Sequence, residues 1–110
     1  MYPRELKWSK AEKEIARRAF DAAYLRECGE IKSKLSKMVD GVTESWDLWR
    51  IHDYLTEQRK KTDAKYDYRY SVLPLVFGRL LKEGWLKDSD LEGLSDDKIE
   101  VIHRVAGLTG

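Results

Sequence analysis

The feature that most limits the fold is a long run in which apolar side chains recur at helical spacing. Steps of four and three residues separate Phe20, Tyr24, Cys28, Ile31, Leu35, Met38 and Val42. This rhythm, close to 3.5 residues, is typical of helices that pack side by side. Ser9 and Glu12 have the spacing of a capping box, and Asp40-Gly41 is a turn signal in which Gly41 can adopt a positive φ. The pattern predicts one long helix over about residues 10–39.

A second long helix is predicted directly after this turn, with Thr43 or Ser45 as its N-terminal cap. The stripe expected to be buried has the same spacing and consists of Leu48, Ile51, Leu55, Gln58 and Thr62. Two helices joined by about two to five residues form an antiparallel hairpin. Such a hairpin cannot cover its own apolar stripes, so it needs a third helix or a second copy of itself. We expect a homodimer through the long helices, in preference to a monomeric bundle.

The rest of the chain predicts a small helical head. A helix over about 71–83 has Pro74 in its first turn, where a missing N–H costs little, and Gly84 at its end. The inner face of this helix is expected to be Leu73, Val76, Phe77, Leu80 and Leu81. A last helix is expected between a cap at Ser95 and an end at Gly107. Its inner face is expected to be Ile99, Ile102, Val105 and Ala106.

Three tyrosines between the hairpin and the head leave one boundary open. Tyr66, Tyr68 and Tyr70 alternate as in a strand, but a strand needs a partner strand and the sequence offers none. Either the second helix breaks near Asp63 or a single helix continues through the tyrosines. In both cases the fold class is all-α. We expect one helical domain over 1–110, with the hairpin and dimerisation region at about 10–62 and the head at about 63–107.

The composition excludes several classes of function. There are 21 Lys and Arg against 20 Asp and Glu, so the formal net charge of +1 creates no overall attraction to nucleic acid or to an anionic membrane. No apolar run approaches the roughly 20 residues of a membrane span, and the N-terminal residues lack the apolar core of a secretion signal. Cys28 is the one cysteine, so no internal disulfide can form. We expect a cytoplasmic protein.

The most informative short stretch is SWDLWRIHDYLTEQR, residues 45–59. At about 100° per residue, one broad side of this helix carries Trp49, His52, Asp53, Thr56 and Arg59. This side lies about a third of a turn from the apolar stripe. Tryptophan and arginine are enriched at binding hot spots, because they combine a large contact area with a polar group. The stretch therefore predicts a surface for a partner or for a second copy. Trp46 is expected to be buried near the helix start.

Catalysis and metal binding are not expected. Neighbours on a helix do not face each other, so Asp53 is poorly placed to orient His52. No serine or second cysteine pairs with His52 as a nucleophile, and Cys28 is expected to be a buried, inert thiol. The two histidines, His52 and His103, lack the spacing of a metal site, and no glycine-rich phosphate loop follows a strand. We therefore expect neither an enzyme nor a cofactor.

A longer segment, DLWRIHDYLTEQRKKTDAKYDYRYSVLPLVFGRLLKEGWL, resembles the fluorescence recovery protein family. These proteins are small cyanobacterial regulators of photoprotection, with relatives in other bacteria. The matching positions are Trp8-Ser9, Ala11-Glu12, Asp47-Leu48-Trp49, His52-Asp53-Tyr54-Leu55, Arg59, Lys65-Tyr66-Asp67, Arg69, Ser71-Val72, Val76-Phe77, Leu80-Leu81 and Glu83-Gly84. The resemblance covers roughly residues 8–105. It implies an α-helical dimer whose long antiparallel helices form the interface and carry a small helical head.

The resemblance also implies a function without covalent chemistry. Family members bind the photoactivated, red form of the orange carotenoid protein, mainly through its C-terminal domain. They speed its return to the dark, orange form, which ends quenching of the phycobilisome. The alternative is a similar dimeric helical module that binds a different protein, such as a related carotenoid-binding protein, in a bacterium without phycobilisomes.

The resemblance further implies which residues contact the partner or close the dimer. The family's functional Trp, His, Asp and Arg correspond to Trp49, His52, Asp53 and Arg59. In the head, Phe77 corresponds to an aromatic residue that contacts the partner. Lys98 corresponds to a basic residue near the start of the last helix.

Overall fold

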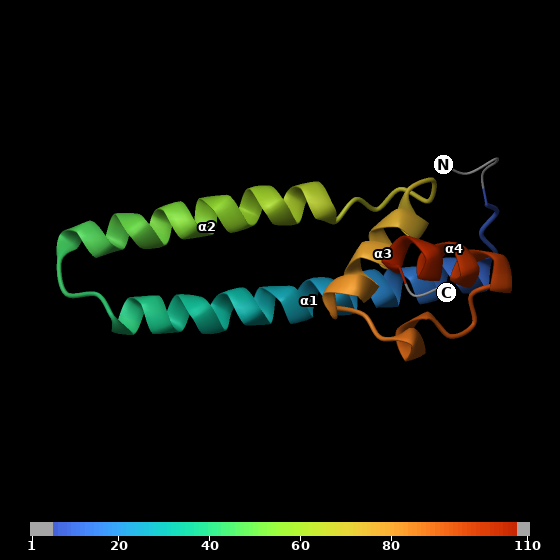
Figure 1. Ribbon diagram of the computed structural model, residues 1–110, viewed down its shortest axis with the longest axis horizontal. Helices are drawn as coiled ribbons and strands as arrows, with labels where there is room; N and C mark the ends of the chain where they lie inside the picture. The colour runs from blue at the N-terminus through green and yellow to red at the C-terminus, as the bar shows by residue number, and fades with distance from the viewer. Residues whose placement is uncertain (1–5, 108–110) are drawn as a thin grey trace.

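The computed structural model of the protein describes residues 6–107. Its elements are α1 (Lys10–Asp40), α2 (Ser45–Lys65), α3 (Leu73–Glu83), the 3-10 helix η1 (Asp88–Leu91) and α4 (Asp96–Ala106). Residues 6–107 contain no strand. The helices α1 and α2 form a long antiparallel hairpin, and the other helices gather beside the N-terminal half of α1 (Figure 1). The predicted all-α fold, with a hairpin and a head, is confirmed.

The first helix begins and ends where the sequence predicts, because its caps are local. The Ser9 hydroxyl accepts a hydrogen bond from the Glu12 backbone N–H at 3.1 Å, and the Ser9 N–H donates to the Glu12 carboxylate at 3.0 Å. This is the predicted capping box. At the other end Gly41 has a φ of −87°, so the expected positive φ is wrong. The Gly41 N–H instead donates to the Lys37 carbonyl within the last turn.

The start of α2 differs from the prediction, since its N-cap is Glu44 rather than Thr43 or Ser45. The Asp47 carboxylate accepts hydrogen bonds from the backbone N–H groups of Thr43 and Glu44 at 3.0 and 3.2 Å. These two backbone bonds lower the pKa of Asp47. An ionised carboxylate inside the first turn is a stronger acceptor than a serine or threonine hydroxyl, and it binds two donors at once.

The boundary that the sequence left open falls at Lys65, where α2 ends. The following tyrosines form neither a strand nor more helix. Their rings pack against α1 instead, with Tyr68 at 4.8 Å and Tyr66 at 5.4 Å from Phe20, centroid to centroid. Tyr70 continues the row by lying 5.7 Å from Trp8. These aromatic contacts stabilise the non-helical backbone of the tyrosine segment.

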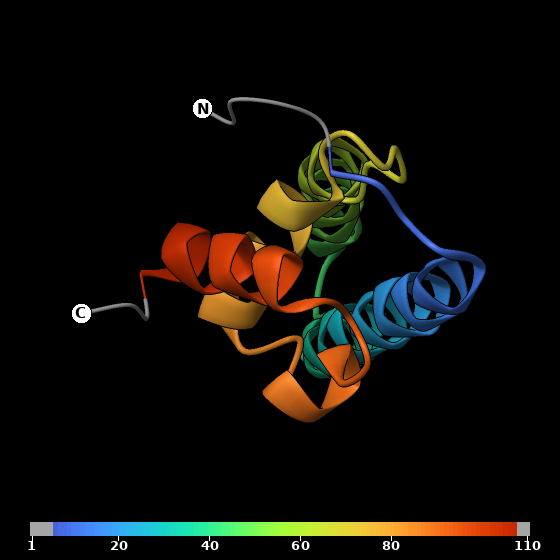
Figure 2. The ribbon, with the colours of Figure 1, turned by 90° about the vertical axis from the view of Figure 1, so that its right-hand side faces the viewer.

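The apolar core lies in the head, where α3 and α4 pack against each other. Phe77, Leu80 and Ile102 have no exposed surface. The predicted inner faces are buried or half-buried, and Gly84 and Gly107 end their helices in the left-handed conformation. The end view in Figure 2 shows α3 and α4 on one side of both hairpin helices.

The helix η1 was not predicted, and α1 holds it in place. The Arg26 guanidinium donates to the Asp90 carboxylate at 2.8 Å and to the Trp85 carbonyl at 2.9 Å. In addition, His103 of α4 lies 2.6 Å from Asp88. The helix therefore depends on residues far from it in sequence, which local patterns do not reveal.

Only the first half of α1 among the two hairpin helices contributes buried apolar residues to the core. The buried apolar residues of α1 stop at Ala23, and the next buried apolar residue along the chain is Leu73. The helix α1 thus has two roles, because its first half packs in the head and its second half forms one arm of the hairpin (Figure 1).

Candidate functional site

The residues predicted from the sequence as a contact surface lie on α2 and are open to solvent. Trp49 is 63% exposed, and His52, Asp53 and Arg59 are exposed as well. His52 and Asp53 approach to 3.5 Å, although neighbours on a helix were expected to point apart. Their side chains are 69% and 82% exposed, so water screens this contact and leaves it little strength.

Two hollows along α2 bring part of this set together. The first, of about 410 Å³, lies between α1 and α2 and is lined by Tyr24, Cys28, Ile31, Leu55, Gln58, Arg59, Thr62 and Asp63. The second, of about 390 Å³, is lined by His52, Leu55, Thr56, Arg59, Lys60 and Asp63. Arg59 lines both, and its guanidinium lies 3.6 Å from Asp63. The structure therefore places His52 beside Arg59, whereas Trp49 and Asp53 line neither hollow.

An unusual amount of apolar surface is exposed along the hairpin. The large apolar side chains concerned are Tyr24, Leu25, Val39, Trp46, Leu48, Trp49 and Leu55. The expected burial of Trp46 is wrong, because it is 67% exposed and no described element covers that side of the first turn of α2. The hairpin, which carries these exposed side chains on both of its helices, is therefore a candidate interaction surface.

Phe77 and Lys98 do not belong to this surface. Phe77 has no exposed area, since it lies on the stripe of α3 that faces α4. Lys98 is 2% exposed, and its ammonium bonds the Glu12 carboxylate at 3.1–3.2 Å and the Ser95 hydroxyl at 3.0 Å. Neither residue can touch a partner directly in this fold. The family resemblance identified their positions but not the direction in which their side chains point.

Glu12 is the centre of the polar cluster around Lys98. Burial raises the pKa of this carboxyl, but bonds from the Ser9 and Ser95 backbone N–H groups and from Lys98 outweigh burial and lower the pKa to about 2. The Lys98 ammonium also lies 5.1 Å from the centroid of the Trp8 ring, a cation–π contact. This cluster ties the start of α1 to the start of α4.

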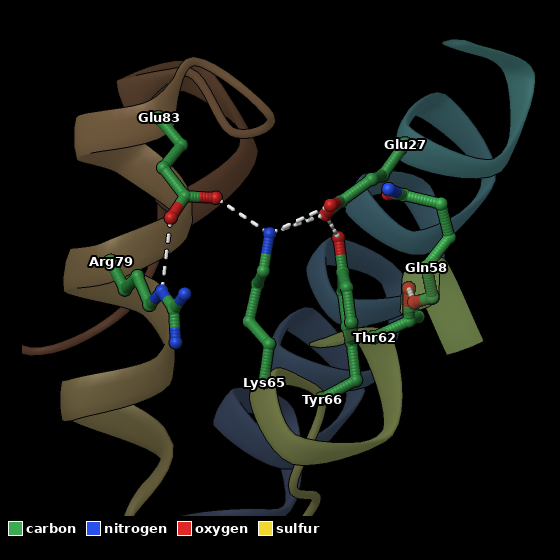
Figure 3. Close-up of polar contacts among 7 residues, drawn as sticks. All are labelled: Glu27, Gln58, Thr62, Lys65, Tyr66, Arg79 and Glu83. Carbon is green, nitrogen blue, oxygen red and sulfur yellow. Dashed lines mark hydrogen bonds and ion pairs between the residues drawn. The ribbon is translucent and has the colours of Figure 1, made fainter. Parts of the chain in front are cut away.

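A second buried polar cluster, centred on Lys65, was missed by sequence reasoning (Figure 3). The Lys65 side chain is 6% exposed, and its ammonium lies 2.7 Å from Glu27 of α1 and 2.6 Å from Glu83 of α3. The Tyr66 hydroxyl donates to Glu27 at 2.8 Å, and Arg79 donates to Glu83 at 2.9 Å. The only signal in the sequence was that Lys65 and Tyr66 fall within the segment that resembles the family.

Burial and hydrogen bonding shift the pKa values of Glu83 and Tyr66 in this cluster. Burial raises the pKa of Glu83, but hydrogen bonds from Lys65 and Arg79 more than compensate and leave it below its ordinary value. Burial and the hydrogen bond to Glu27 raise the pKa of Tyr66. At neutral pH the carboxylate and the phenol therefore keep their ordinary charge states.

The described residues show no arrangement for metal binding or for crossing a membrane. Residues 6–107 contain no group of three or more His, Cys, Asp or Glu side chains that could hold a metal ion. In the same part of the chain, no helix combines the length and the apolar character of a membrane span. The exposed apolar and charged side chains of α2 are suited to protein contact.

Comparison with known proteins gives the family. Residues 8–106 match the family described as photoprotection regulator fluorescence recovery protein. The chain belongs to the fluorescence recovery protein family. The fluorescence recovery protein of Synechocystis sp. is 38% identical over 104 residues, which cover 94% of this chain and 95% of that protein.

Solved structures of fluorescence recovery proteins have the same fold. The Fremyella diplosiphon protein has a TM-score of 0.85 and 40% identity, over 92% of this chain and 99% of that one. The Synechocystis protein has a TM-score of 0.86 and 38% identity, over 93% of this chain and 100% of that one. The hairpin with a helical head is thus the fold of fluorescence recovery proteins, and the chain is a member of a family of photoprotection regulators.

Proposed function

We propose that this protein binds the photoactivated orange carotenoid protein, mainly through the C-terminal domain of that protein, and accelerates its return to the dark, orange form. The proposal rests on the family and on one observation, the solvent exposure of Trp49, His52, Asp53 and Arg59 on a single helix. A regulator that binds most tightly to arrangements on the way back to the compact form lowers the barrier to that return and so accelerates it. No covalent step is needed, so the activity is non-enzymatic.

The proposed active form is a homodimer that covers the open side of the hairpin. The absence of buried apolar side chains between Ala23 and Leu73 supports it, because the arms expose Leu48 and Leu55, which a second copy would bury. Within the complex, Trp49 would serve as the desolvated anchor and Arg59 as a charge-assisted donor. Phe77 and Lys98 would act inside the head by keeping it folded. The proposed location is cytoplasmic.

The test is to mix the protein with photoactivated orange carotenoid protein and to follow the red-to-orange recovery by absorbance in the dark. The wild-type protein should accelerate recovery. Trp49→Ala should reduce the acceleration by roughly 30-fold or more, the effect of losing about 2 kcal/mol or more at a hot spot. Leu75→Ala is the control, because this apolar side chain is exposed as well but lies on α3 rather than on the hairpin.

Two outcomes would count against the proposal. An unchanged recovery rate at excess wild-type protein would show that the chain does not act on this partner. Equal rates for wild type, Trp49→Ala and Leu75→Ala would show that the assigned surface is not the one used. Solution molar mass, measured on the same samples, separates loss of the dimer from loss of partner binding.

A further inference from the structure

The helix α2 is attached to the rest of its own chain almost entirely through polar groups. Its buried residues are Thr62 and Lys65, both in the last two turns. The Thr62 hydroxyl donates to the Gln58 carbonyl within α2 itself, at 2.7 Å, and so makes no hydrogen bond to another helix. Within the single chain, interlocking buried apolar side chains therefore do not fix the position of α2.

Lys65 is the residue that connects α2 to two other helices at once. Its ammonium donates to both oxygens of Glu27 on α1, at 2.9 and 2.7 Å, and to Glu83 on α3, at 2.6 Å (Figure 3). A lysine has three N–H donors, and these bonds account for all of them. Tyr66 and Arg79 complete the cluster by donating to the same two carboxylates. Two cations thus balance two carboxylates.

A buried cluster of this kind acts more on geometry than on stability. Desolvation of the charges cancels much of the attraction between them, so such pairs add little net stability. Apolar surfaces tolerate sliding, whereas an ammonium between two carboxylates keeps its bonds only in one position. Lys65 therefore restrains the last turn of α2 relative to both α1 and α3, together with Tyr66, which also bonds Glu27.

We propose that Lys65 is a positioning residue for the regulatory function, because it fixes where the exposed face of α2 lies relative to the head. This inference rests on the proposed function. Trp49 is sixteen residues from Lys65 along α2, or about 24 Å at 1.5 Å per residue. A tilt of α2 by about 10° at Lys65 would move Trp49 by about 4 Å over this length. A partner that contacts both the hairpin and the head would then lose one set of contacts.

Four variants separate positioning from simple stability. Lys65→Met removes the ammonium and leaves two carboxylates facing each other, which destabilises the fold. Lys65→Met combined with Glu27→Gln removes one charge of each sign, so it relieves the unpaired carboxylate but restores no link between the helices. Lys65→Arg keeps a cation with several donors. Lys61→Met is the matched control, since this lysine is exposed on the same helix.

The geometry is measured in the free protein by spin labels on exposed positions of α2 and α4. The labels are introduced by Glu57→Cys and Glu100→Cys in a Cys28→Ser background. Each labelled chain carries both labels and is mixed with excess unlabelled protein, so that any dimer contains at most one labelled chain and only the distance within one chain is measured. Wild type, Lys61→Met and Lys65→Arg should give one narrow distance distribution. The double variant should give a broad one, even though its melting temperature is above that of Lys65→Met.

The functional measurement is the recovery of the orange form at saturating regulator. The double variant is expected to lose at least fivefold in the saturated rate, and Lys61→Met is expected to match wild type. A narrow, wild-type distance distribution together with a wild-type rate in the double variant would overturn the inference. If the wild-type protein itself fails to accelerate recovery, the proposed function fails, and the distance distributions alone then decide whether Lys65 positions α2.

Discussion

Gly78→Ala should destabilise the head, whereas the same substitution at Gly29 should stabilise α1. A Cβ at Gly78 would lie 2.5 Å from the Cβ and Cγ1 atoms of Val105 and 3.0 Å from the carbonyl oxygen of Ile102. Carbon atoms in contact normally lie about 3.5–4.0 Å apart, so α3 and α4 would have to separate by about 1 Å. A Cβ at Gly29 would meet no atom within 4 Å.

The expected magnitudes follow from two opposing effects. Alanine is favoured over glycine inside a helix by about 0.8–1.0 kcal/mol, and Gly29→Ala should gain this amount in full. At Gly78 the same gain is opposed by overpacking, which costs about 1–3 kcal/mol or more in a close-packed core. Because backbone and a β-branched residue crowd this site, we expect the upper part of that range and a net loss of about 1–2 kcal/mol.

The free energy of unfolding is measured by urea denaturation followed by circular dichroism. All variants are compared at one protein concentration, because the proposed dimerisation would make apparent stability depend on concentration. The two variants should differ by about 2–3 kcal/mol, with opposite signs relative to wild type. If Gly78→Ala were as stable as Gly29→Ala, the close approach of α3 and α4 at Gly78 would be refuted.

Two further predictions concern the inside of the head. The pKa of Glu12 falls from 4.5 to about 2 on folding, so its contribution to stability is complete above about pH 4.5 and is lost as the pH falls toward 2. Glu12→Gln should lower the free energy of unfolding by about 1–3 kcal/mol at neutral pH, because Lys98 loses its charged partner. In urea titrations, this variant should lose less further stability than wild type between pH 4.5 and 2. Equal acid sensitivity in both proteins would contradict this assignment. Phe77→Ala should lower the unfolding free energy by about 3–5 kcal/mol, whereas Leu75→Ala, on the exposed side of the same helix, should be nearly neutral. Similar losses for both would argue against the burial of Phe77.

Local chemistry explains which elements could be predicted from the sequence. The capping box at Ser9 and Glu12, the proline in the first turn of α3 and the left-handed glycine at its end each act within a few residues. The start of α2 was predicted less well because its cap is the Asp47 side chain, which reaches back from inside the helix. In the sequence, this aspartate looks like an ordinary acidic residue of a first turn. The sequence singled out Trp49 and Arg59 because both fall on one broad side of a predicted helix. Both are exposed in the structure, and their role in binding stays a prediction.

The rest required the tertiary structure. Periodicity reveals which face of a helix is apolar, but it does not reveal what covers that face. It therefore predicted burial for Trp46, which is exposed, and it gave no indication that Lys98 is enclosed. The resemblance to the family located Phe77 but not its direction, since a position in a motif carries no information about packing.

The sequence by itself indicated the four α-helices of this protein, its family and the face of α2 that is predicted to carry Trp49 and Arg59, because each of these depends on residues close together in the chain. It did not reveal η1 or the end of α2. Only the tertiary structure decided how that face is held. Lys65 and Glu27 are 38 residues apart, and they form an ion pair only because the hairpin brings the end of α2 back to α1. Such a pair has no local pattern, since its energy depends on the burial that the whole fold creates.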